Sequence, residues 1–162
     1  AAAEIPLTFN NGFQITGLNF GSDVVYHITP FQVTYRAQFA DRAYTYLTNY
    51  VSLYTSITQA RQNIYPRFAQ ALSLNYKYAV TGVNANQFLA SGTFYLPGFS
   101  INHNLVINAA FQEKNKNSVI SFSNDFPFSR GYTAENLYRL EKIGANYHFP
   151  IAYPDAGLAN TD

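Results

Sequence analysis

Hydrophobic and polar side chains alternate along several segments of this chain, most regularly between residues 71 and 80. One set of alternate positions is apolar or aromatic, namely Leu72, Leu74, Tyr76, Tyr78 and Val80. The set between them is small or polar, namely Ala71, Ser73, Asn75, Lys77 and Ala79. Successive side chains of a β-strand point to opposite faces of a sheet, so this segment predicts a strand with one apolar and one hydrated face.

Other segments repeat this pattern with different regularity. An apolar stripe opposite a polar one also occurs at residues 31–40, 105–112 and 142–149. Looser candidates, rich in Tyr, Thr and Phe, lie at residues 13–20, 24–28, 43–57 and 88–96. Turn-forming residues separate the segments, at 10–12, 82–86, 97–98, 114–117 and 154–157. The sequence therefore predicts an all-β antiparallel meander.

One stretch also fits a helix. Thr133, followed by Ala134-Glu135-Asn136, is a helix-start signal, and Leu137, Leu140 and Ile143 or Gly144 follow it at helical spacing. A short helix at this point is the alternative to a strand.

The composition explains what kind of sheet this is. Charged residues make up only 12% of the chain and aromatic residues 17%, and the polar stripes carry mostly Ser, Thr, Asn, Gln, Ala and Gly. The polar face of a soluble β-sandwich usually carries many charges, whereas small neutral polar groups suit the interior of a membrane barrel. We therefore expect part of a transmembrane β-barrel in the outer membrane of a Gram-negative bacterium, in contact with outer-membrane lipids. A soluble sandwich with an aromatic core is the alternative.

Membrane strands need about 9–11 residues, and with turns each unit takes about twenty, so the chain predicts about eight strands in one domain, residues 1–162. Either these form a complete small barrel or they are the later strands of a larger one. Aromatic residues near the predicted strand ends would form the interfacial girdles, namely Tyr65, Phe68, Tyr95, Phe99, Phe149 and Tyr153. Residues 1–6 lack the pattern of a signal peptide, so we expect one to be already removed or to lie upstream.

Charge and motifs disfavour several classes of function. A formal charge of +1 disfavours nucleic-acid binding, and the lack of Cys excludes disulfides and thiolate chemistry. His27, His103 and His148 have no metal-ligand spacing, and neither a nucleophile elbow nor a carboxylate pair is recognisable. We therefore expect no enzyme, no metal and no cofactor.

The most distinctive local feature is the aromatic-rich stretch at residues 125–132, in which Arg130 precedes the flexible Gly131 and Tyr132. If this loop folds into a barrel, the Arg130 guanidinium can pin it by a bidentate bond to a carboxylate on the wall. An exposed arginine in an external loop fits the sequence equally well.

These residues, together with Tyr147, Phe149 and Pro150, resemble the outer-membrane assembly factor superfamily, which includes BamA-like barrel-assembly proteins and two-partner-secretion transporters. That family carries an R-G-Y or R-G-F tripeptide on a loop inside a sixteen-stranded barrel, and a following strand similar to Y-x-F-P-L. Ile151 stands here in place of the usual Leu. Residues 65–67, 95–98 and 102–103 resemble related Bacteroidetes-type barrels attached to periplasmic domains.

The resemblance implies insertion or translocation of polypeptides at the outer membrane, with Arg130 locking the loop, Gly131 allowing a tight bend and Tyr132 packing against the wall. Client polypeptides and other outer-membrane or periplasmic subunits would be the partners. The chain departs from the family in one important respect: the acidic partner of the loop arginine, within F-x-D-x-G on a later strand, is not found before residue 162. A passive or structural barrel that anchors a periplasmic domain or admits small solutes is the second hypothesis, and a soluble carbohydrate-binding sandwich the third.

Overall fold

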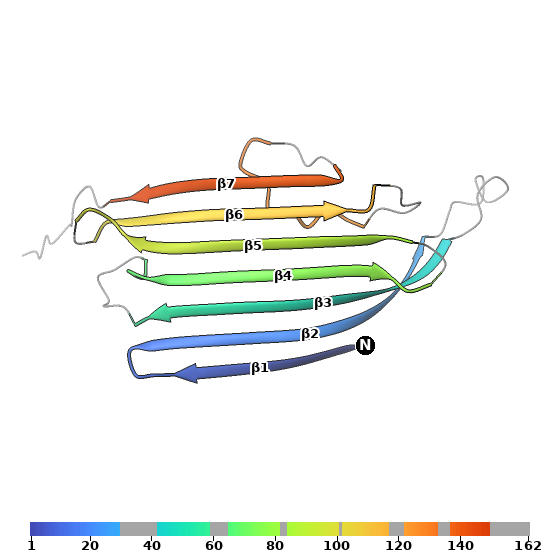
Figure 1. Ribbon diagram of the computed structural model, residues 1–162, viewed down its shortest axis with the longest axis horizontal. Helices are drawn as coiled ribbons and strands as arrows, with labels where there is room; N and C mark the ends of the chain where they lie inside the picture. Colours follow the sequence, from blue (N-terminus) through green and yellow to red (C-terminus); the bar gives the residue numbers. More distant parts are fainter. Residues whose placement is uncertain are drawn as a thin grey trace, which may run out of the picture.

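The computed structural model describes residues 1–29, 42–58, 65–81, 84–100, 102–116, 122–132 and 137–149. Within these residues all regular secondary structure is β-strand. The strands are β1 (Ala2–Asn10), β2 (Gln14–Thr29), β3 (Arg42–Ile57), β4 (Ala69–Ala79), β5 (Asn86–Pro97), β6 (Asn104–Lys114) and β7 (Arg139–His148). Sequence neighbours pair antiparallel in the order β1 to β7, so the predicted all-β antiparallel meander is confirmed (Figure 1).

The pairing register gathers apolar residues on one side of the sheet, which we call the apolar face. Residues directly opposite each other on paired strands share a face. One such row crosses the sheet through Leu7, Leu18, Leu53, Leu72, Gly92, Ala109 and Ile143. A second row on this face contains Ile5, Phe20, Val51, Leu74, Ala90, Phe111 and Glu141.

The opposite side, which we call the polar face, carries the residues between these positions. One of its rows contains Pro6, Asn19, Ser52, Ser73, Ser91, Ala110 and Lys142. The alternation predicted for residues 71–80, 105–112 and 142–149 therefore matches the register of β4, β6 and β7. The segment at residues 31–40 lies outside the described residues.

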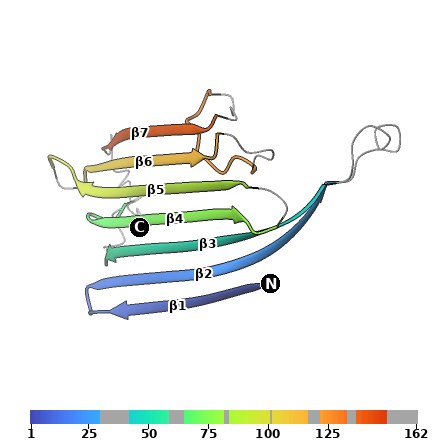
Figure 2. The same ribbon diagram turned by 45° about the vertical axis from the view of Figure 1, so that its right-hand side comes forward.

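The sequence analysis divided one of the first strands into two and missed another. Residues 13–20 and 24–28 form a single strand, β2, because its pairing with β3 continues unbroken from Gln14 to Thr29. β1 was not predicted at all, since its first residues are Ala-rich and it contains Pro6. Proline is tolerated here because β1 is the edge of the described sheet, where one backbone N–H can lack a ladder partner. The far ends of β2 and β3 extend beyond their neighbours (Figures 1 and 2).

The helix considered after Thr133 is wrong for the residues that the structure describes there. Leu140 and Ile143 both belong to β7, where pairing with β6 keeps the backbone extended. Residues 133–136 themselves lie outside the described ranges. Residues three positions apart lie on opposite faces of a strand. In β7, Leu140 therefore lies on the polar face and Ile143 on the apolar face.

The described sheet is open, so barrel closure is not established. β1 and β7 lie at opposite edges in both views (Figures 1 and 2). As odd-numbered strands of an antiparallel meander, they run in the same direction. Seven strands are described where about eight were expected.

The apolar face has no protein layer against it among the described residues. The buried hydrophobic residues of the described chain are few, namely Ala69, Ala85, Val106, Ala110, Phe122 and Phe126. Those that belong to strands, Ala69, Val106 and Ala110, lie on the polar face. Val51, Leu74 and Phe20 are exposed although their strands lie well inside the sheet or next to its edge. In the described part of the chain no helix is long and apolar enough to cross a membrane.

A glycine allows a close contact on the polar face between β1, β2 and β3. A Cβ on Gly21 would lie 2.5 Å from the Tyr50 hydroxyl oxygen and 2.7 Å from the Ala3 carbonyl oxygen. Tyr50 thereby reaches across β2 and donates a hydrogen bond to Glu4 Oε2 at 3.0 Å. Asn19 donates to the other carboxylate oxygen, so Glu4 ties the edge strand to β2 and β3.

Substitution Gly21→Ala should destabilise the sheet, whereas Gly17→Ala on the same strand and face should not. The methyl group added at position 21 would clash with the backbone of Ala3 as well as with Tyr50, and such overpacking costs about 1–3 kcal/mol. A Cβ on Gly17 meets no atom within 4 Å, so its replacement is expected to be neutral or slightly stabilising. Denaturant titration of the folded protein measures both changes. Equal stability of the two variants would contradict the described contact.

Candidate functional site

Residues 122–132, which precede β7 in the chain, fold back over the polar face and define the candidate site. We call this segment the inward loop. Its contacts reach β3, β4, β5, β6 and β7, so it spans most of the sheet. The inward loop thereby covers the face that carries neutral polar residues and leaves the apolar face open.

An ionic contact and two buried amides hold the centre of the inward loop. Asp125 forms a salt bridge with Lys77 of β4 and accepts a hydrogen bond from Gln87 at 3.5 Å. Gln112 donates to Asn124 Oδ1 at 2.7 Å, and its own oxygen accepts from Gln87 at 3.5 Å. Gln87 is 1% exposed and Gln112 0% exposed. Burial of these amides requires polar partners. The inward loop supplies acceptors for both amide nitrogens, Asp125 for Gln87 and Asn124 for Gln112, whereas Gln87 Oε1 has no hydrogen-bond partner among the described residues.

Phe122 anchors the beginning of the inward loop. Its ring packs against Tyr46 and Tyr44 of β3, at centroid distances of 5.2 and 6.4 Å, and its carbonyl oxygen accepts a 2.9 Å hydrogen bond from Lys114. Phe122 is only 5% exposed. Because the Phe122 ring packs on tyrosines and its carbonyl oxygen binds the Lys114 ammonium, both packing and hydrogen bonding fix this end of the loop.

The sequence-predicted tripeptide lies at the other end of the inward loop. Gly131 has a φ of 87°, a conformation that glycine adopts readily and other residues rarely. Arg130 is exposed and forms no ion pair with the residues that the structure describes, so its expected carboxylate partner is not among them. Tyr132 is 76% exposed, and its backbone N–H donates to the Ser129 carbonyl oxygen at 3.3 Å.

The inward loop and β7 together border a hollow of about 640 Å³. Phe126, Phe128, Gly131 and Tyr132 line one side, and Leu140 to Ile143 of β7 line the other. Lys142 also donates to the Pro127 carbonyl oxygen at 2.9 Å. The tripeptide therefore lies beside the outer edge strand of the described sheet.

The second predicted motif lies at the far end of β7. The Tyr147 hydroxyl accepts a hydrogen bond from the Phe99 N–H at 3.1 Å and lies 2.7 Å from His103 Nδ1. Phe149 packs against the Tyr147 and His103 rings at centroid distances of 6.4 and 6.0 Å. Pro150 lies outside the described residues. The two motifs are thus separated by the length of β7 and do not form a common site.

Residues of the weaker resemblance do come together at this same end of the sheet. Tyr65 stacks on Tyr95 with a centroid distance of 6.0 Å and lies 4.6 Å from the His148 ring. Asn104 donates to the Pro66 carbonyl oxygen at 2.9 Å. Aromatic residues thus line the strand ends on both faces.

Sequence analysis missed the residues that hold the inward loop. Lys77 and Gln112 were assigned to the hydrated face and Asp125 to the loop, but nothing in the sequence paired them. The available signal was a lone lysine in a neutral polar stripe, because such a charge needs a partner when it is covered. Among the described residues no group of three or more potential metal ligands occurs. The comparisons with protein families, curated proteins and solved structures gave no match.

Replacement Asp125→Ala should loosen the inward loop without unfolding the sheet. It removes the partner of Lys77, which is 15% exposed, and we expect a loss of about 1–2 kcal/mol in loop attachment, since charged hydrogen bonds contribute on this scale. Hydrogen–deuterium exchange should then accelerate across residues 122–132 and stay unchanged in β4 and β5. The control is Ser123→Ala, an exposed loop position. Unaltered exchange in Asp125→Ala would mean that this ion pair does not retain the loop.

Proposed function

We propose that this chain forms part of a transmembrane β-barrel in a bacterial outer membrane and takes part in the insertion or translocation of polypeptides. The apolar face meets lipid, and the polar face with its inward loop lines the lumen. The observation that carries this proposal is the asymmetry of the sheet. One face leaves large apolar side chains uncovered, while the other is covered by a loop with polar and ionic contacts.

Exposure of the apolar face supports contact with lipid. Side chains such as Ile5, Val51, Leu74 and Ile143 are well exposed, and burying apolar surface yields about 25 cal/mol per Å². Contiguous apolar surface of this extent is rare on soluble monomers. The strands, at 9 to 16 residues, are long enough for the roughly 9–11 residues of a membrane strand.

Composition of the polar face supports a lumen. Its central rows carry Ser, Asn, Thr and Gln, and its lysine at position 77 is paired by the inward loop. Lipid cannot satisfy the exposed backbone groups of an open sheet edge, so β1 and β7 each need a partner strand in a membrane. Because these two strands run in the same direction, an all-antiparallel barrel requires an odd number of further strands between them.

The inward loop with its Arg-Gly-Tyr tripeptide supports a role with polypeptides. If the polar face lines a barrel lumen, the inward loop lies inside the barrel, as the resemblance to outer-membrane assembly factors implies. Arg130 stays exposed on this loop, so its five N–H donors can bind a carboxylate on a wall strand outside the described residues. A passive barrel that anchors a periplasmic domain or conducts solutes has the same faces and differs in having no use for this arginine.

Replacement Arg130→Ala should separate these two functions. In vesicles that contain the natural full-length protein, we expect the yield of an added unfolded outer-membrane protein that inserts to fall at least tenfold. The variant itself should still migrate as a heat-modifiable species in detergent electrophoresis, because the sheet does not depend on Arg130.

The matched control is Arg67→Ala, which removes an exposed arginine outside the inward loop and should leave insertion unchanged. Full insertion activity in a folded Arg130→Ala variant would contradict a role of the tripeptide with polypeptides and favour the passive barrel. Absence of heat-modifiable migration in the unsubstituted protein would contradict the membrane barrel itself.

A further inference from the structure

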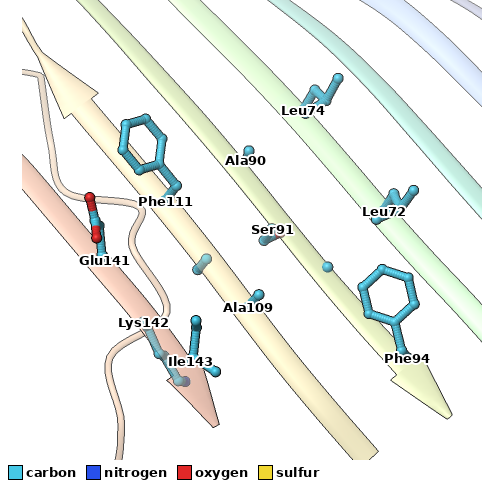
Figure 3. A pocket seen from close by; sticks show the side chains of 12 residues that line it. Leu72, Leu74, Ala90, Ser91, Phe94, Ala109, Phe111, Glu141, Lys142 and Ile143 are labelled. Atoms are coloured by element: carbon cyan, nitrogen blue, oxygen red, sulfur yellow. The ribbon is translucent and has the colours of Figure 1, made fainter. Parts of the chain in front are cut away.

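A hollow of about 420 Å³ opens on the apolar face over β4, β5, β6 and β7. It forms because the centres of β5 and β6 carry the small residues Ala90, Gly92 and Ala109, while their neighbours on the same face are large. Figure 3 shows Ala90 and Ala109 between Phe94 and Phe111. The hollow is therefore a consequence of residue size in the two central rows of the apolar face.

The side chains of Leu72 and Phe94, at the sides of the hollow, lie close to Gly92. A Cβ placed on Gly92 would lie 3.0 Å from Leu72 Cδ2 and 3.3 Å from a ring carbon of Phe94. These contacts narrow the hollow at Gly92, so its free space lies over Ala90 and Ala109. An elongated apolar group fits such a space better than a broad ring does.

One end of the hollow carries charged groups on the same face. Arg139 lies 5.4 Å from the centroid of the Phe111 ring and donates from Nε to Glu141 Oε1 at 2.8 Å. Glu113 lies opposite Arg139 in the register of β6 and β7. Arg139 and Glu141 are more than half exposed, and the guanidinium has further donors free to bind another anion. The rim thus offers one cation between two carboxylates.

We propose that this hollow binds one acyl chain of a phospholipid with a zwitterionic headgroup. The chain lies over Ala90 and Ala109, the phosphate binds the Arg139 guanidinium, and the headgroup ammonium lies beside the carboxylates of Glu113 and Glu141. Arginine binds phosphate through paired N–H donors, and two carboxylates favour a cation beside it. An anionic headgroup without an ammonium would place a net negative charge beside two carboxylates.

If the apolar face meets lipid, dispersion contacts favour an acyl chain in the hollow. An empty hollow costs the dispersion contacts of its lining, and a methylene chain restores them. This inference rests on the proposed membrane location, since only a lipid-facing surface meets acyl chains.

Native mass spectrometry of the full-length protein in detergent tests the site. The mixed micelles contain equal amounts of a zwitterionic phosphoethanolamine lipid and an anionic phosphoglycerol lipid. We expect one retained molecule of the zwitterionic lipid, with retention reduced about tenfold in Ala109→Phe, which fills the hollow. The control Ala3→Phe makes the same change on the same face of β1, outside the hollow, and should retain the lipid.

A second variant, Glu141→Gln, should reduce the preference for the zwitterionic lipid, because it removes one of the two carboxylates beside the headgroup ammonium, while the hollow still accepts acyl chains. Ala90→Leu replaces Ala109→Phe if the latter does not fold. Heat-modifiable migration of each variant reports folding separately from lipid binding. Equal retention in the filled variant, retention of the anionic lipid instead, or a dimer held through this face would overturn the lipid site while the barrel proposal stands. Loss of heat-modifiable migration in the unsubstituted protein would overturn both.

Discussion

The rest of the structure depends on the pairing register of neighbouring strands, which the hydrophobic pattern and the turns between the strands set. A shift of one residue would exchange the two faces of a strand. The observed register brings Leu53 of β3 opposite Leu72 of β4, and Ser52 opposite Ser73, so apolar and polar rows continue across the sheet. One continuous apolar face and one continuous polar face follow from this constraint.

The two faces then meet different requirements. On the polar face the buried amide nitrogens of Gln87 and Gln112 need hydrogen-bond acceptors, which the inward loop supplies with Asp125 and Asn124. On the apolar face no described protein layer covers the large side chains, and lipid is the environment that suits them. The proposed function and the proposed lipid site both follow from this division, one on each side of the same sheet.

Much of the fold could be predicted from the sequence, because period-two alternation in residues 71–80 and 105–112 directly reports the two faces of β4 and β6. The limits are local. β1 was not predicted because it contains Pro6, and proline disfavours strands except at an edge. β2 was predicted as two segments separated at Gly21, because its continuity depends on pairing with β3. The candidate site was only half predictable: the Arg-Gly-Tyr tripeptide is visible in the sequence, whereas the contact between Lys77 and Asp125 joins residues far apart in the chain.

Contact of the apolar face with lipid is the central claim, and site-directed quenching tests it most directly. The chain has no cysteine, so single cysteines at positions 72 to 75 can each carry a fluorophore in protein folded into vesicles. We expect a lipid-soluble quencher to act on the labels at positions 72 and 74, and an aqueous quencher on those at positions 73 and 75. Equal quenching of all four labels, or aqueous quenching at positions 72 and 74, would contradict contact of the apolar face with lipid.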